Sequence, residues 1–139
     1  SALKDIVIPH SVTSIGEFAF RECSSLTSII IPDGVTSIEG HTFRGCSSLT
    51  SIVIPHSVTS IGMYAFKECS SLTSIVIPDG VMIIGDCAFY NCFSLTSITF
   101  KGTKKQWKKI GLCIDWKYGV PAKAVHSTDG DVKVRIYGT

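Results

Sequence analysis

Four cysteines are evenly spaced along the chain: Cys23, Cys46, Cys69 and Cys92. Zinc sites in proteins need cysteines or histidines at much closer spacing, typically two to four residues apart, so this wide spacing predicts no metal site. Stacked units would place the thiols about 5 Å apart, and distance alone does not exclude a disulfide. We interpret the four cysteines as a ladder of small, buried apolar side chains. Cys87 and Cys113 lie off the ladder, and their redox state stays open.

A second column alternates imidazole and carboxylate groups at the same interval, with the members His10, Asp33, His56 and Asp79. Such a column could form ion pairs near neutral pH or hold a divalent metal. However, each aspartate precedes a glycine and each histidine precedes a serine, which is typical of turns. We therefore interpret the column as turn chemistry and predict no bound metal.

Catalytic motifs are missing from the sequence. Its serines repeat in columns without a G-x-S-x-G elbow or a fixed histidine and aspartate partner, and no phosphate-binding glycine loop occurs. His126, Asp129 and Asp131 form one local acid and base cluster, in a Ser-Thr-Asp-Gly loop where these residues usually make turns. We expect no enzyme activity, no catalytic residues and no cofactor.

The cysteine ladder belongs to a 23-residue repeat with the pattern L-x-x-I-x-I-P-x-x-V-x-x-I-x-x-x-A-F-x-x-C-x-x, present as four full units and the start of a fifth. Alternation in each Ile-x-Ile-Pro segment predicts a short strand that the proline ends. After the proline, an Asp-Gly or His-Ser pair forms a corner, and the residues that follow it, as in 35–38, predict a second short extended segment. The Ala-Phe-x-x-Cys stretch predicts a turn or a single 3₁₀ turn. No unit can bury its apolar residues alone, so the sequence predicts a β-rich solenoid of short parallel strands stacked at the repeat interval.

The repeat resembles the BspA-like leucine-rich repeat, for example from Leu49 to Pro55 and from Ala65 to Cys69. This resemblance implies a leucine-rich repeat array that acts as a binding scaffold in a bacterial surface or secreted protein. It also implies an extracellular or cell-surface location, adhesion, and a protein or glycan partner that a host could supply.

The length suits one domain, and we expect it to consist of a repeat array at 1–100 and a C-terminal capping segment at 101–139. Thr103 is a plausible N-cap for a helix over 104–110, and the runs 122–126 and 132–136 predict a hairpin. The sequence starts inside a unit, without a segment that caps the first strand. We expect a fragment of a longer chain, or self-association through this uncapped N-terminal end.

Composition and charge narrow the possible partners. The chain has 139 residues, of which 45% are hydrophobic and 17% charged, which excludes extensive disorder. No apolar run is long enough for a transmembrane helix, and the first residues have no leader pattern. Residues 1–100 carry a net charge of −4 and residues 101–139 a net charge of +6. The basic cap could attract an anionic polymer, but its lysines also suit a solvated face, and no signature for specific nucleic-acid binding occurs.

The outward face of the predicted strands is the candidate partner-binding site. Alternation turns one apolar residue per strand outward, flanked by serines. The column of His10, Asp33, His56 and Asp79, which we call the corner column, lies at the end of these strands. Exposed apolar patches tend to be interaction sites, although β-branched residues also serve strand propensity alone or become covered by neighbouring elements. The candidate residues are Ser28, Ile30, Asp33, Ser51, Val53, His56, Ser74, Val76 and Asp79. We expect a non-enzymatic binding module, with a structural spacer as the alternative. A third possibility is an enzyme or an anionic-polymer binder that uses the cap.

Overall fold

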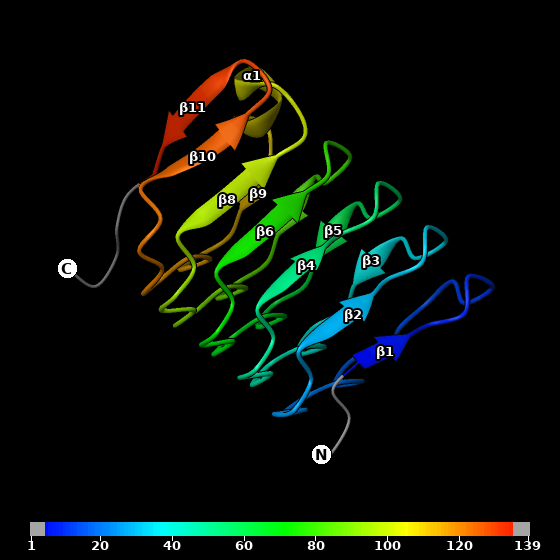
Figure 1. Ribbon diagram of the computed structural model, residues 1–139. Coiled ribbons are helices and arrows are strands. Elements are labelled where there is room, and N and C mark those ends of the chain that lie inside the picture. Colours follow the sequence, from blue (N-terminus) through cyan, green and yellow to red (C-terminus); the bar gives the residue numbers. More distant parts are fainter. Residues whose placement is uncertain (1–4, 135–139) are drawn as a thin grey trace.

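The computed structural model describes residues 5–134, and they form a solenoid of stacked β-strands (Figure 1). One strand per repeat lies on what we call the front face, and these strands follow each other from the blue end of the ribbon to the red end. They are β1 (Asp5–Val7), β2 (Ser28–Ile30), β4 (Ser51–Val53), β6 (Ser74–Ile77) and β8 (Ser97–Phe100). The predicted solenoid of parallel strands at 23-residue intervals is confirmed.

A second, back sheet runs along the array and consists of two-residue strands. Its strands are β3 (Ser37–Ile38), β5 (Ser60–Ile61), β7 (Ile83–Ile84) and β9 (Gly111–Leu112), paired in that order. Ser37 lies opposite Ser60 and Ile38 opposite Ile61, so equal repeat length sets the register. The second extended segment expected at 35–38 is therefore present over its last two residues.

The front sheet is divided into two parts. β1 pairs with β2, and β4 begins a separate sheet that continues through β6, β8 and the cap strands. Thr50 donates its backbone N–H to the Thr27 carbonyl at 3.4 Å, just before β4, but β2 and β4 do not pair as strands. The sheet is therefore interrupted between the second and third described front strands.

The core between the sheets is built from ladders of identical side chains. Phe43 stacks on Phe66 and Phe66 on Phe89, with ring centroids 5.3 and 5.2 Å apart. Leucine, isoleucine, valine and cysteine columns are buried beside the rings in the middle repeats. Trp116 meets Phe89 edge-on at 6.3 Å and Trp107 at 5.8 Å, so aromatic side chains of the cap cover the end of the core.

Each Ala-Phe-x-x-Cys stretch is a turn, as predicted. Two residues per turn adopt positive φ, for example Tyr64 (φ 57°) and Glu68 (φ 63°), and Gly45 takes the second position in the preceding repeat. Left-handed φ is unfavourable for non-glycine residues. Backbone hydrogen bonds between neighbouring turns stabilise this conformation. Tyr64 donates its N–H to the Asp86 carbonyl at 2.9 Å and Phe66 donates to Ala88 at 2.7 Å.

The cap contains helix α1 (Lys104–Trp107) and a hairpin of β10 (Ala124–Ser127) and β11 (Gly130–Lys133). Thr103 is the N-cap as predicted, and it shares a reciprocal capping box with Gln106. The helix is shorter than the expected 104–110 because the chain leaves it to form β9, where Gly111 donates to the Met82 carbonyl at 2.9 Å.

The hairpin is present, but its turn is shorter than predicted. Ser127 lies opposite Gly130, so the loop holds two residues rather than the five expected from the sequence. Gly130 adopts a positive φ of 129 degrees. L side chains rarely adopt this conformation, so the glycine permits the tight turn. Residues 135 and 136 of the expected second strand lie outside the described residues, as do residues 1–4 of the first repeat.

Candidate functional site on the front sheet

Strand alternation sorts the front-sheet residues into a buried and an exposed set. Ile29, Ile52 and Ile75 point into the core, whereas their neighbours point outward. Val7, Ile30 and Val53 are 74%, 65% and 65% exposed and lie on the outward side. Register places Val7 opposite Ile30 and Val53 opposite Val76, so one apolar column runs along the outside.

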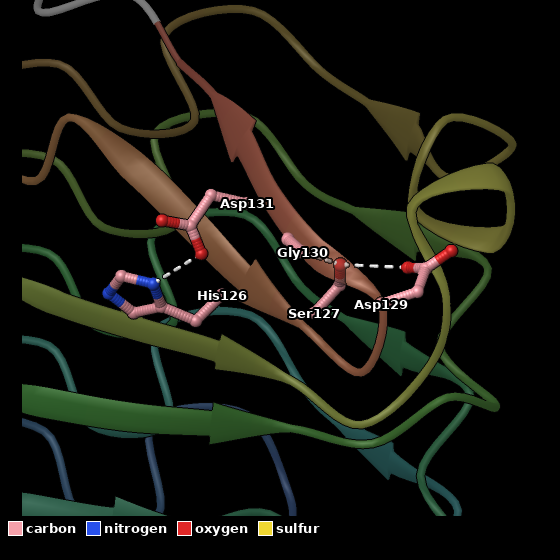
Figure 2. Close-up of polar contacts among 5 residues, drawn as sticks. All are labelled: His126, Ser127, Asp129, Gly130 and Asp131. Atoms are coloured by element: carbon pink, nitrogen blue, oxygen red, sulfur yellow. Dashed lines mark hydrogen bonds and ion pairs between the residues drawn. The ribbon is translucent and has the colours of Figure 1, made fainter.

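The column changes character toward the cap. Val76 and Thr99 are half-buried, and β8 then pairs in parallel with β10, which places His126 opposite Thr99. His126 lies opposite Asp131 of β11, and its Nδ1 is 2.8 Å from the Asp131 carboxylate (Figure 2). Sequence reasoning placed His126 in a loop cluster and missed that it extends the outward column. The strand signal at 122–126 indicates a strand that ends at His126 but not its pairing with β8.

A groove of about 280 Å³ lies at the interruption between β2 and β4. Its lining includes five of the nine residues proposed from the sequence, which are Ser28, Ile30, Asp33, Ser51 and Val53. Ser74, Val76 and Asp79 lie one repeat further along and do not line it. The structure therefore brings one part of the expected site together around a defined hollow.

The corner column lies beside this groove. His56 Nδ1 is 3.9 Å from Asp33 Oδ1, and both side chains are more than three-quarters exposed. On the neighbouring strands, Ser28 donates its hydroxyl to the Asp5 carboxylate at 2.7 Å. No group of three or more metal-binding side chains occurs within residues 5–134. The groove is thus flanked by carboxylates and a single imidazole.

The cations of the array lie at the turns and not beside the groove. Between residues 5 and 100 the lysines and arginines are Arg21, Arg44 and Lys67. Arg21 lies over the Phe18 ring at 5.5 Å, Arg44 over Tyr64 at 5.7 Å, and Lys67 over Tyr64 at 5.1 Å. The groove therefore has an aspartate but no lysine or arginine in its lining.

His41 lies in the same row of turn side chains as Phe18 and Tyr64. Its ring stacks on Phe18 at 4.6 Å and approaches Tyr64 at 4.9 Å, and its Nδ1 is 3.2 Å from Arg44 Nη1. Burial lowers the pKa of His41, and the positive charge of Arg44 lowers this pKa further. Both effects favour the neutral imidazole over the protonated one within the stack.

The cysteine ladder is buried and bonded to backbone. Cys46, Cys69 and Cys92 each donate the thiol to the carbonyl of a phenylalanine 26 residues earlier, at 3.1, 3.1 and 3.0 Å. Burial raises the pKa of Cys46 to about 12. All six cysteines, including Cys87 and Cys113, are free thiols in the structure. These contacts agree with the interpretation of the ladder as core.

The polar side chains of the hairpin turn in Figure 2 make hydrogen bonds within the turn and to the start of α1. Ser127 donates its hydroxyl to the Asp129 carboxylate at 3.3 Å, and that carboxylate accepts the backbone N–H of Lys104 at 2.8 Å. This backbone bond is the main reason that the pKa of Asp129 is lowered. His126 and Ser127 are adjacent in β10 and point to opposite faces of the sheet, so they do not form a nucleophile and base pair.

Comparisons with known proteins agree with this architecture. Residues 1–111 match the model of the BspA type leucine rich repeat region, in six copies. A leucine-rich repeat protein from Bacteroides ovatus ATCC 8483 is 39% identical with a TM-score of 0.76, over 88% of this chain and 31% of that one. A leucine rich cell surface protein from Faecalibacterium prausnitzii A2-165 is 39% identical with a TM-score of 0.77, over 78% and 29% of the two chains.

A third solved structure, the leucine-rich repeat protein of T. pallidum, is 34% identical with a TM-score of 0.67, over 80% of this chain and 56% of that one. The chain thus spans less than two thirds of the length of these relatives. No curated protein matches it. In the described residues, no helix has the length and apolar character needed to cross a membrane. The family match covers most of the sequence, and the chain belongs to the BspA-type leucine-rich repeat family.

Proposed function

We propose that the chain is a non-enzymatic binding module that engages a protein or glycan partner through the outward face of the front sheet. The observation that carries this proposal is the exposed column Val7, Ile30 and Val53 beside the groove between β2 and β4. Solenoids use such extended sheet faces to bind partners, and exposed apolar side chains on a folded domain are typical of interaction sites.

The groove is a hollow on this face that a side chain of the partner could fill. Binding energy at interfaces is concentrated in a few residues that fill hollows, and Ile30 and Val53 form the apolar part of this hollow. Serine hydroxyls and the Asp33 carboxylate at its margin supply hydrogen-bond acceptors and donors. The module acts by surface complementarity, without a bound cofactor or metal.

The relatives suggest where such a module works. One solved relative is described as a cell surface protein, and we propose a cell-surface or secreted location for this chain, with adhesion to a host-derived partner. Self-association through the N-terminal end stays a prediction, because β1 has only β2 as its partner among the described strands. Sedimentation that shows a monomer at every concentration would remove it.

The test compares binding by wild type and by the variants Ile30→Lys and Val53→Lys. Immobilised glycans and secreted animal proteins serve as probes, and Phe93→Lys is the control because Phe93 is 62% exposed and outside the front strands. We expect both front-face variants to stay folded and to lose binding at least tenfold, while the control keeps it. Retained binding in the front-face variants contradicts the proposal. Absence of any binding favours the alternative, a structural spacer.

A further inference from the structure

One repeat breaks the polar pattern of the back sheet. Three repeats carry Val-Thr-Ser-Ile at the start of the back strand, at 12–15, 35–38 and 58–61. The fourth carries Val81-Met82-Ile83-Ile84, so an apolar pair replaces the two polar residues. In these four-residue segments the first residue, valine, and the last residue, isoleucine, point into the core. The two residues between them, Thr-Ser in three repeats, occupy the outward positions.

The structure leaves this apolar pair uncovered. Met82 is 69% exposed and Ile83 is 44% exposed. Ile83 lies opposite Gly111 of β9, which has no side chain to cover it. Leu112 and Ile114, which follow Gly111, are 39% and 71% exposed. Leu112 lies opposite the buried Ile84 and therefore belongs to the inward-facing column. We call the outward pair Met82 and Ile83 the back patch.

Folding gives no reason for the change. Met82 donates its N–H to the Thr59 carbonyl at 2.8 Å, and Thr59 donates to Thr36 at the same distance. The backbone thus pairs in the same way whether the side chain is polar or apolar. Isoleucine has a higher strand propensity than serine, but methionine has no such advantage over threonine, so strand propensity does not explain the exposed Met82.

Met82 of the back patch lines a groove whose charged lining residues are Lys109 on the cap side and Asp79 on the array side. This groove has a volume of about 440 Å³ and is lined by Asp79, Val81, Met82, Gln106, Lys109 and Ile110. Lys105 and Lys108 are exposed beside Gln106 and Lys109 in the sequence. Residues 101–134 contain eight lysines and three aspartates, so the cap as a whole carries a net charge of +5.

We propose that the back patch docks an apolar, acidic segment of a partner protein. Aliphatic or aromatic side chains of the segment cover Met82 and Ile83, and a carboxylate pairs with Lys109 at the groove. Complementary charge steers such a segment toward the cap and disfavours a basic one. The back patch lies on a different sheet from the front-face column, so this interaction is separate from the proposed front-face function.

The variant that tests this proposal restores the repeat's own pattern. Met82→Thr combined with Ile83→Ser gives the Val-Thr-Ser-Ile sequence found in the other three repeats, so the variant keeps the fold. A random peptide library displayed on phage is selected on the immobilised wild-type protein and depleted on this double variant. We expect the surviving peptides to be enriched in aliphatic or aromatic residues and in aspartate and glutamate.

Titration of synthesised peptides then measures the contribution of each part of the surface. We expect the double variant to weaken binding of a selected peptide at least tenfold, Lys109→Glu to weaken it several-fold, and Val53→Lys to leave it unchanged. Failure to enrich any peptide, or enrichment of neutral or basic ones, overturns the proposal. Sedimentation in which wild type dimerises and the double variant does not also overturns it, because the occupant is then a second copy.

Discussion

Cys69 donates its thiol proton to the backbone carbonyl of Phe43, 3.1 Å away in the preceding repeat. The same bond recurs one repeat earlier and one repeat later in the array. Each thiol thus satisfies a carbonyl at the turn while its sulfur packs in the core. The cysteine ladder couples neighbouring turns through hydrogen bonds, without covalent links.

This relationship predicts that the ladder thiols are chemically inert in the folded protein. With a pKa of about 12, Cys46 has about one thiolate in ten thousand molecules at pH 8. We expect Ellman's reagent to modify Cys46, Cys69 and Cys92 at least about a hundredfold more slowly than Cys113, which is half-buried. Mass spectrometry of the labelled peptides measures each rate. Equal rates for all cysteines before denaturation would contradict this interpretation.

Gly62 should tolerate no side chain. A Cβ atom there would lie 2.6 Å from the Gly40 nitrogen and 2.8 Å from the Glu39 carbonyl carbon, which are backbone atoms. We expect Gly62→Ala to lower the free energy of unfolding by about 1–3 kcal/mol, the usual cost of overpacking. Gly16→Ala is the control, since no atom lies within 4 Å of its added Cβ. Denaturant unfolding of the two variants compares them, and equal midpoints would refute the close approach.

His41 should make stability depend on pH. Its pKa is lowered in the folded protein below the ordinary value of 6.5, so the unfolded chain binds the proton more readily. The free energy of unfolding therefore falls as pH drops through the unfolded pKa and stops falling below the folded pKa. His41→Tyr should remove this part of the loss, because Tyr64 occupies the same position in the next repeat.

The measurement is the unfolding free energy of wild type and His41→Tyr at pH 7.5 and at pH 5. Other titrating groups are common to both proteins, so only the difference between the two pH effects reports on His41. We expect wild type to lose more stability between the two pH values than the variant does. An identical loss in both proteins would show that His41 titrates alike in the folded and unfolded states.

The sequence predicts most of the array because the relevant information is local and periodic. Alternation in Ser-Ile-Val-Ile specifies which side chains point inward, and equal repeat length specifies the register between strands. The division between β2 and β4 is not signalled by the pattern, because both strands carry the same Leu-Thr-Ser-Ile start and the same proline end. The position of His126 depends on β10 pairing with β8, a contact made by the non-repeating cap, so the period does not reveal it.

Thr103 should stabilise the cap through its capping box. Its hydroxyl accepts the Gln106 N–H at 3.2 Å, and the Gln106 side chain accepts the Thr103 N–H at 2.7 Å. We expect Thr103→Ala to lower the free energy of unfolding by about 1 kcal/mol, whereas Thr103→Ser retains the hydroxyl and costs much less. Equilibrium unfolding in urea checks both, and a full loss in the serine variant would point to the methyl group instead.

In the part of the chain that the structure describes, the antiparallel pairing of β11 with β10 ends the run of parallel front strands. A repeat inserted between two existing repeats meets a parallel neighbour on each side, whereas one placed after β11 meets a strand that runs the opposite way. Gains and losses of repeats during evolution should therefore occur before the hairpin of β10 and β11. Relatives would then differ in array length and reach while they share one closing segment.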